Sequence, residues 1–437
     1  MHYTTTAAAL IPDPIPDGYL VEDTKVRTHP EHAGRITYLD GLRGVAIAMV
    51  LVFHAWYHYM RIPDALAYRP RTFMEAIVRQ GYQGVSLFLV LSGFCLAYPL
   101  LRRREDGRAN WFAPPVFYAR RALRILPPYY AAVALFVGLS VLIAHNRWPL
   151  LSIVGQPPGR LDVLSHLALV HNVTGFNNSI NGSFWSLGLE WQWYWAFPLV
   201  LALCVWRPRV ALGVCFGIAI AWHVWTHDLW SLGALPARLF EFCCGIAAAS
   251  LVVLRAKLRR RVLVAGIVLP LLLMQARSVT LAGHETHAWL INHSLHAVDS
   301  LGLTQPLWGV VFASLLLLGY HCRWTNAVLS WRPLAALGIA SYSIYLIHEP
   351  VIQAVETWVP PGLARSPVIM PIALACGIVC GVLFHVCIER PCMRRATWQA
   401  VSPALLRLFA RTDVMKILVL AKKAAWRMAS DAHPDCI

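Results

Sequence analysis

Apolar runs that are long enough to cross a bilayer recur along the 437-residue chain, and they constrain its fold more than any other feature. The composition agrees, because 58% of the residues are hydrophobic, only 14% are charged and the mean hydropathy is +0.53. Several runs are short or contain proline, so some helices should tilt or break. We predict an all-α polytopic membrane protein with about ten transmembrane helices, at residues 41–59, 82–101, 125–145, 184–206, 210–226, 236–254, 262–282, 303–320, 335–356 and 367–388.

Basic residues outnumber acidic ones, with 38 Lys and Arg against 22 Asp and Glu and a formal charge of +16. Such a balance can indicate a nucleic-acid partner, but here the basic residues lie between the apolar runs. Cytoplasmic loops of membrane proteins carry this kind of excess. When the N-terminus is placed in the cytoplasm, most Lys and Arg residues fall on the cytoplasmic side. We therefore predict cytoplasmic N- and C-termini and no nucleic-acid partner.

The two ends of the chain differ from its apolar middle, the predicted transmembrane domain at residues 36–395. Residues 1–35 mix Pro, Asp, Glu and Thr without an apolar run, so we expect a disordered cytoplasmic tail and no cleavable signal peptide. Residues 396–437 combine apolar side chains with Arg and Lys, which is typical of an amphipathic cytoplasmic segment on anionic lipids. Membrane lipids are therefore expected partners.

The eleven cysteines lie mostly within or beside apolar runs, and none has zinc-ligand spacing with histidine. We interpret them as small packing residues, and we expect neither a metal site nor a disulfide framework.

The first apolar run, LRGVAIAMVLVFHAW at residues 42–56, contains a permanent cation and a titratable base. Arg43 and His54 are eleven residues apart, which on an α-helix leaves them about 20° apart in direction and about 16 Å apart along the axis. They therefore share one face, with His54 near the middle of the bilayer. A structural interpretation stays open, in which Arg43 reaches the headgroups and His54 is a satisfied core residue. Asp40, one turn earlier, is expected to orient Arg43.

Two arginine motifs have helical spacing. Seven arginines lie between residues 101 and 130, and two of them, Arg121 and Arg124, are three residues apart in RRALR. On a helix they share a face, and arginine suits bidentate binding of phosphate. The pair predicts a phosphorylated ligand at the cytoplasmic mouth of the bundle, although topology alone would also place arginines here. Arg238 and Glu241 are also three apart, and we interpret them as a structural ion pair.

Glu190 lies in an aromatic stretch, NGSFWSLGLEWQWYW at residues 181–195, at the predicted outer start of a span. A carboxylate at that depth normally needs a partner. Sugar rings stack on tryptophan, and a carboxylate accepts sugar hydroxyls. We therefore predict an outer acceptor site that includes Trp185, Ser186 and Glu190, although interfacial tryptophans are also routine.

The ninth run contains SYSIYLIHEP, which groups two serines, two tyrosines and His348. We place His348 toward the outer end of this span. Ser341 and Tyr342 are predicted to bind the acceptor as well. Hydrogen bonding between helices would explain the same residues without a functional role.

Together and in this order, the motifs resemble those of the membrane acyltransferases of family three. The likeness covers about residues 36–395. It rests on Arg43 with His54, LSGF at 91–94, Arg121 with Arg124, SFWSLGLE at 183–190, SYSIYLIHEP at 341–350 and IERP at 388–391. The resemblance implies an enzyme of the bacterial inner (cytoplasmic) membrane that moves an acyl group, often acetyl, from acyl-CoA to a hydroxyl of an envelope glycan.

The resemblance also implies roles for single residues. His54 would be the essential histidine, acting as general base on the acceptor hydroxyl or becoming acylated itself. Arg43, Glu190 and His348 are further candidate catalytic residues. Acyl-CoA would be a co-substrate, no cofactor would be bound permanently, and the acceptor would be a glycan or glycolipid. The implied CoA ligands are Arg43, Arg121 and Arg124.

A second class of protein stays open from the residues alone. A transporter or flippase of a lipid-linked sugar would also have about ten spans, an outer aromatic sugar site and ionisable residues inside the membrane. Against it, the chain shows no repeated halves, and a transporter does not require the arginine cluster. Turnover of acyl-CoA by the purified protein separates the two classes.

Overall fold

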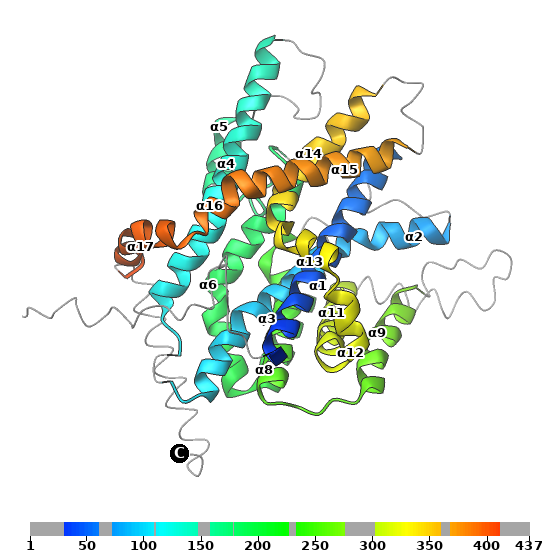
Figure 1. Cartoon of the computed structure of the whole chain (residues 1–437), viewed down its shortest axis with the longest axis vertical. Coiled ribbons are helices and arrows are strands. Elements are labelled where there is room, and N and C mark those ends of the chain that lie inside the picture. The colour runs from blue at the N-terminus through cyan, green and yellow to red at the C-terminus, as the bar shows by residue number, and fades with distance from the viewer. Residues whose placement is uncertain are drawn as a thin grey trace, which may run out of the picture.

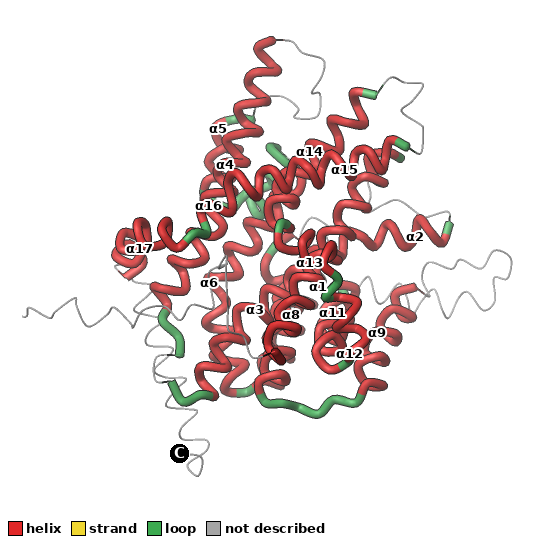
Figure 2. Tube along the Cα trace, viewed as in Figure 1, coloured by secondary structure: helices red, strands yellow, loops and turns green. Residues whose placement is uncertain are grey.

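The structure, a computed structural model, describes residues 30–60, 72–108, 111–146, 158–177, 179–226, 233–275, 302–359 and 368–410. These residues form helices joined by loops and contain no strand (Figure 1 and Figure 2). The predicted all-α class is therefore confirmed for the part of the chain that is described.

Most of the helices pack side by side as a bundle (Figure 1). In chain order the elements are α1 (Pro30–Tyr59), α2 (Phe73–Arg79), η2 (Gln80–Gln83), α3 (Gly84–Glu105), α4 (Pro114–Asn146), α5 (Arg160–Leu167), η4 (Gly182–Phe184), α6 (Trp185–Trp206), α7 (Pro208–Thr226), α8 (Leu235–Val253), α9 (Arg260–Gln275), α11 (Thr304–His321), α12 (Arg323–Leu329), α13 (Arg332–Ile339), α14 (Ser341–Trp358), α15 (Ile369–Phe384), η6 (His385–Glu389), α16 (Arg390–Cys392) and α17 (Arg395–Ala410).

Within the described ranges, six helices are long and apolar enough to cross a membrane, or up to eight if each of two bent pairs is one span. The bends measure 105° between α11 and α12 and 78° between α13 and α14, which agrees with the expectation of broken spans. The predicted number of ten is not confirmed. Helix α6 is not among the six, because Glu190, Gln192 and its tryptophans lower its mean hydropathy. Helix α9 is not among them, because its described part has only 16 residues. The cytoplasmic location of both termini stays a prediction.

Helix α1 packs against α3, α13 and α14. Two glycines allow close approach: a Cβ on Gly41 would lie 1.6 Å from the carbonyl oxygen of Leu329 in α12, and one on Gly338 would lie 1.8 Å from that of Asp40. These backbone contacts fix the part of α1 that carries the first candidate site residue. There Arg43 Nη1 donates to Asp40 Oδ1 at 2.9 Å, as the sequence predicts.

A buried ion pair ties α8 to α3 and α11. Arg238 Nη1 lies 3.0 Å from Glu241 Oε1, and both side chains are almost fully buried. The same nitrogen contacts Ser86 Oγ at 3.1 Å and the side-chain oxygen of Gln305. The predicted structural pair is confirmed, because both charges are satisfied inside the protein.

The two predicted tails fall mainly outside the described residues. Helix α1 already begins at Pro30, so the last residues of the predicted tail 1–35 are helical. Helix α17 forms the first part of the predicted segment 396–437 and packs on α4, where the Arg120 guanidinium lies 5.7 Å from the ring centre of Trp398. Residues 1–29 and 411–437 lie outside the described part of the chain.

Candidate functional site

The predicted arginines line one cavity. Arg43 of α1 and Arg121 and Arg124 of α4 surround a space of about 110 Å³, together with residues of α3, α6 and α14. The two α4 arginines share a face, as their spacing predicts. Arg43 is held by Asp40 and by a contact of its Nη2 with Cys95 Sγ at 3.5 Å. We call this space the arginine pocket.

A wider cavity of about 500 Å³ adjoins the arginine pocket, and the same three arginines line both. Arg103 of α3 and Arg120 of α4 add two more cations, while Asp40 and Glu389 are the carboxylates among the lining residues. Five guanidinium groups therefore face one concave surface. Such a surface favours a ligand that carries several negative charges.

Most of the predicted acceptor residues lie with the arginines and not in a separate outer site. Glu190 lines the arginine pocket, and its Oε1 accepts a hydrogen bond from the Tyr194 hydroxyl at 2.5 Å. Trp185 lies elsewhere, with the Arg238 guanidinium 5.8 Å from its ring centre. The sequence could not place these residues relative to α4, because that depends on how α6 and α14 pack. The other predicted acceptor residues in the pocket are Ser186, Ser341 and Tyr342.

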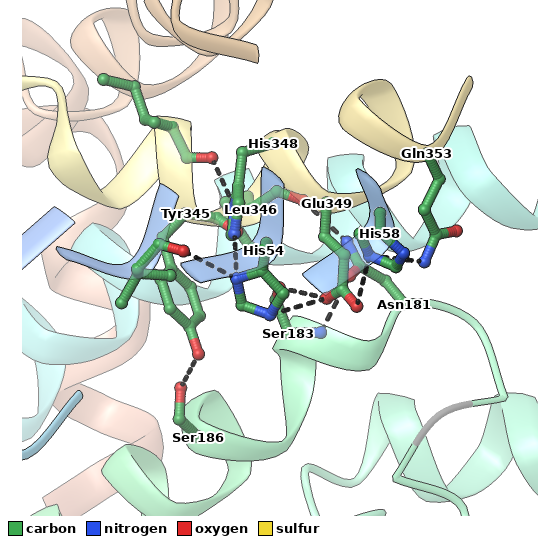
Figure 3. A network of polar contacts seen from close by, with 12 residues as sticks. His54, His58, Asn181, Ser183, Ser186, Tyr345, Leu346, His348, Glu349 and Gln353 are labelled. Atoms are coloured by element: carbon green, nitrogen blue, oxygen red, sulfur yellow. Dashed lines mark hydrogen bonds and ion pairs between the residues drawn. The ribbon is translucent and has the colours of Figure 1, made fainter. Parts of the chain in front are cut away.

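His54 and His348 are in direct contact, although the sequence analysis assigned them to different depths (Figure 3). His348 Nε2 lies 3.2 Å from His54 Nδ1, and the ring centres are 4.9 Å apart. The two residues are brought together where α14, which follows the 78° bend, packs on α1. The two histidines therefore belong to one site.

Hydrogen bonds around the two rings decide where their protons lie. His348 Nδ1 faces the carbonyl oxygens of Tyr345 and Ile344, at 2.9 and 3.1 Å, so it must carry a hydrogen. Neutral His348 then presents the lone pair of Nε2 to His54. His54 Nδ1 faces that lone pair and the Val50 carbonyl oxygen at 3.0 Å, so it carries a hydrogen as well. In neutral His54 the lone pair is consequently on Nε2.

Glu349 faces that lone pair, and it is a residue that the sequence analysis missed. Its Oε2 lies 3.8 Å from His54 Nε2, and its Oε1 lies 3.9 Å from His58 Nε2. A signal was present, because an acid inside an apolar run normally has a partner and Glu349 directly follows His348. We call His54, His58, His348 and Glu349 the histidine cluster.

A pair of hydroxyls stands between the arginine pocket and the histidine cluster. Ser186 and Tyr345 both line the pocket, and Ser186 Oγ donates to Tyr345 Oη at 2.8 Å. The Tyr345 ring centre lies 5.6 Å from that of His348, and its carbonyl oxygen accepts from that histidine. The pocket and the cluster are therefore neighbours.

Glu389, in the IERP motif, is a second carboxylate that the sequence analysis did not single out. It lies 2.8 Å from His385 Nδ1 and accepts a hydrogen bond from Ser343 Oγ at 2.6 Å. It also lines the wider cavity. These contacts connect η6 to α14 at the edge of the arginine-lined surface.

Two further histidines lie close to η4: His166 in the last turn of α5 and His171 in the segment between α5 and η4. The rings of His166 and His171 are stacked, with centres 4.1 Å apart, and neither side chain is exposed. Burial, and secondarily the neighbouring His166, lowers the pKa of His171 to about 4. His171 Nε2 donates to the Phe184 carbonyl oxygen at 2.8 Å, so the pair supports η4, which carries Ser183.

Comparison with known proteins gives the family. Residues 36–388 match the sequence model of a family described as "Acyltransferase domain". The chain is 25% identical over 337 residues to the peptidoglycan O-acetyltransferase OatA of Listeria monocytogenes, covering 72% of this chain and 49% of that protein. It is 25% identical over 397 residues to the acyltransferase MdmB of Streptomyces mycarofaciens, covering 84% and 93%. It is 23% identical over 411 residues to the O-acetyltransferase OatA of Staphylococcus aureus strain MRSA252, covering 87% and 61%.

The chain spans about half the length of the Listeria relative. No solved structure matches it. The family match, in contrast, covers most of the chain and includes every motif from Arg43 to SYSIYLIHEP. The protein is thus a multi-pass membrane protein that belongs to acyltransferase family three.

Proposed function

We propose that the protein transfers an acyl group, most simply acetyl, from cytoplasmic acyl-CoA to a hydroxyl of an envelope or exported glycan at the bacterial inner membrane. The observation that carries this proposal is that an arginine-lined cavity and a histidine with an unused lone pair are neighbours, with one hydroxyl pair between them. Acyl-CoA carries several phosphate charges at one end and a thioester at the end of a long arm. The arginine-lined cavity would bind the phosphates, and the histidine would act at the thioester. Two of the relatives are named as O-acetyltransferases, which supports the reaction class.

The arginines would bind the phosphates of the donor. Planar guanidinium groups bind phosphate oxygens in pairs, and Arg121 and Arg124 face the same space as Arg43. Arg103 and Arg120 extend the positive surface into the wider cavity, which has room for the nucleotide end. The acyl end would then reach the Ser186–Tyr345 pair.

The histidine cluster would carry out the transfer. His54 Nε2 takes the proton of the acceptor hydroxyl while that oxygen attacks the thioester carbon. The new C–O bond forms, the C–S bond breaks, and the CoA thiolate takes the proton from His54 to leave an ester and free CoA. His348 holds the Nδ1 hydrogen of His54 and so keeps Nε2 available, as a positioning residue does for a catalytic histidine. If His54 is acylated first, the same Nε2 attacks the thioester carbon and the C–S bond breaks with release of the CoA thiolate. The acceptor oxygen then attacks the acyl carbon, the C–N bond to His54 breaks, and the hydroxyl proton goes to the thiolate.

Thiol release by the purified protein tests the proposal. We expect the protein in detergent to release free thiol from acetyl-CoA when glycan fragments of the cell envelope are added, with an acetyl ester detected on the glycan by mass spectrometry. A transporter or flippase would give neither product. If the protein neither binds acetyl-CoA nor releases thiol with any fragment, the proposal is wrong.

A further inference from the structure

Polar groups continue along α1 beyond His54. Glu349, His58 and Ser183 gather around the unused lone pair of His54, and Gln353 Nε2 lies 3.1 Å from His58 Nε2 (Figure 3). The side chains of His54, His58 and Glu349 are 17, 16 and 11% exposed, so solvent-sized molecules reach them. None of the three lines the arginine pocket or the wider cavity.

The Glu349 carboxylate is held in place by hydrogen bonding and by the local backbone. Ser183 Oγ donates to its Oε2 at 2.5 Å. A Cβ on Gly182 would lie 2.7 Å from Glu349 Oε1, so only glycine at this position leaves space for the carboxylate. Asn181 fixes this turn, because its side chain accepts from Ser183 N at 3.0 Å and donates to the Leu346 carbonyl oxygen at 2.9 Å. The carboxylate is therefore already held in position before an acceptor binds.

The carboxylate lies beyond hydrogen-bond distance of the two imidazoles. At 3.8 and 3.9 Å, Glu349 is too far from His54 Nε2 and His58 Nε2 for hydrogen bonds. An ion pair that only holds α1 to α14 would be expected to close to hydrogen-bond distance. One hydroxyl that donates to His54 Nε2 and a neighbouring hydroxyl that donates to Glu349, each at about 2.8 Å, would satisfy both groups. The ionised carboxylate can only accept hydrogen bonds, so its ligand must donate.

We propose that Glu349 and His58 form an acceptor subsite that binds the hydroxyl next to the one that reacts, so that the preferred acceptor is a vicinal diol such as a sugar ring. This inference rests on the proposed acyl transfer. The reacting hydroxyl donates to His54 Nε2, and its neighbour donates to Glu349, a charge-assisted hydrogen bond. A monoalcohol has one hydroxyl hydrogen and satisfies only the first position. The subsite therefore favours vicinal diols over monoalcohols.

Two acceptors and three variants test the subsite. We would measure thiol release from acetyl-CoA by purified protein with methyl β-D-glucopyranoside, which has neighbouring hydroxyls, and with cyclohexanol, which has one. The wild-type kcat/KM should favour the glucoside by about tenfold or more, the value of one hydrogen bond to a charged group. Glu349→Gln should abolish this preference mainly by raising the glucoside KM, and His58→Ala should reduce it less. Glu356→Gln, seven residues further along α14, is the matched control and should keep the preference.

Binding of acetyl-CoA separates the possible failures. Its dissociation constant should change less than about twofold in Glu349→Gln, because that residue does not line the donor cavities. Ser183→Ala, which frees the carboxylate but keeps its charge, should lower the preference even if Glu349→Gln does not fold. A preference that survives in these variants, or is absent from the wild type, overturns the subsite. Failure of the proposed function would instead show as no acetyl-CoA binding and no thiol release with any acceptor.

Discussion

The arginine pocket and the histidine cluster share helix α1 but differ in the kind of charge that they hold. The pocket and the adjoining cavity gather five guanidinium groups around open space. The cluster holds three imidazoles and one carboxylate, and each of them has an atom within 4 Å of another member. A guanidinium keeps its proton at all physiological pH values, whereas an imidazole gains and loses one. The middle of α1, at Arg43, is therefore suited to bind fixed negative charge, and its last turns, at His54 and His58, are suited to move protons.

Replacing His54 is the strongest test of this difference between the two regions, because it removes the proposed base. We predict that His54→Ala lowers acyl transfer by about 10²- to 10⁴-fold, the usual contribution of a general base, while the protein still inserts and binds acyl-CoA. Acceptor acylation would be followed by mass spectrometry. His321→Ala, at the end of α11, serves as the control. Near wild-type acylation by a correctly inserted His54→Ala protein would make the histidine structural.

Removing charge from the pocket should weaken binding instead. In Arg121→Ala, Arg124→Ala protein, the loss of each hydrogen-bonded interaction with phosphate should cost about 1.5–3 kcal/mol, so the dissociation constant for acyl-CoA should rise by about tenfold or more per arginine. Calorimetric titration measures this. The control is Arg102→Ala, Arg104→Ala, since these two residues of the same basic segment do not line either cavity. Unchanged affinity in the first double variant would rule out the donor assignment.

Loss of His348 should have a smaller effect than loss of His54. His348→Ala removes one acceptor for the His54 Nδ1 hydrogen, but the Val50 carbonyl oxygen remains at 3.0 Å. We therefore expect a fall in kcat of about 10- to 100-fold, less than when the sole partner of a catalytic histidine is removed. The KM for acyl-CoA should not change. A change in that KM alone would place His348 with the donor.

Acid should disturb the two regions unequally, which is the smallest expected effect. The pKa of His171, about 4, lies below its ordinary value of 6.5, so the unfolded chain binds more protons between these values. Stability is therefore present above about pH 6.5 and is lost as the pH falls toward 4. The melting temperature in detergent should fall over this range, and less so in His171→Phe protein. Because His171 supports η4, acyl transfer should fail before acyl-CoA binding does; equal pH dependence in both proteins would contradict this.

The sequence was sufficient for the parts of the structure that depend on local spacing. Helical periodicity places Arg121 beside Arg124 and Arg43 beside Asp40, and both arrangements are present. The contact between His54 and His348 depends on a helix bend and on packing across 294 positions of sequence, which no local pattern contains. For the same reason Glu190 could be identified as needing a partner but could not be assigned to the arginine pocket. Glu349 could have been identified from the sequence, because an acidic residue inside an apolar run normally has a partner.

Rescue by donor concentration tests the central claim most directly. Initial rates of thiol release would be measured over a wide range of acetyl-CoA concentrations for the wild type, the Arg121→Ala, Arg124→Ala variant and the His54→Ala variant, at one saturating acceptor concentration. If the pocket binds the donor and the cluster performs the transfer, the arginine variant approaches the wild-type rate at high donor concentration and the histidine variant does not at any concentration. Recovery of the His54→Ala rate at high acetyl-CoA, or a low plateau for the arginine variant, would contradict the division between binding and transfer.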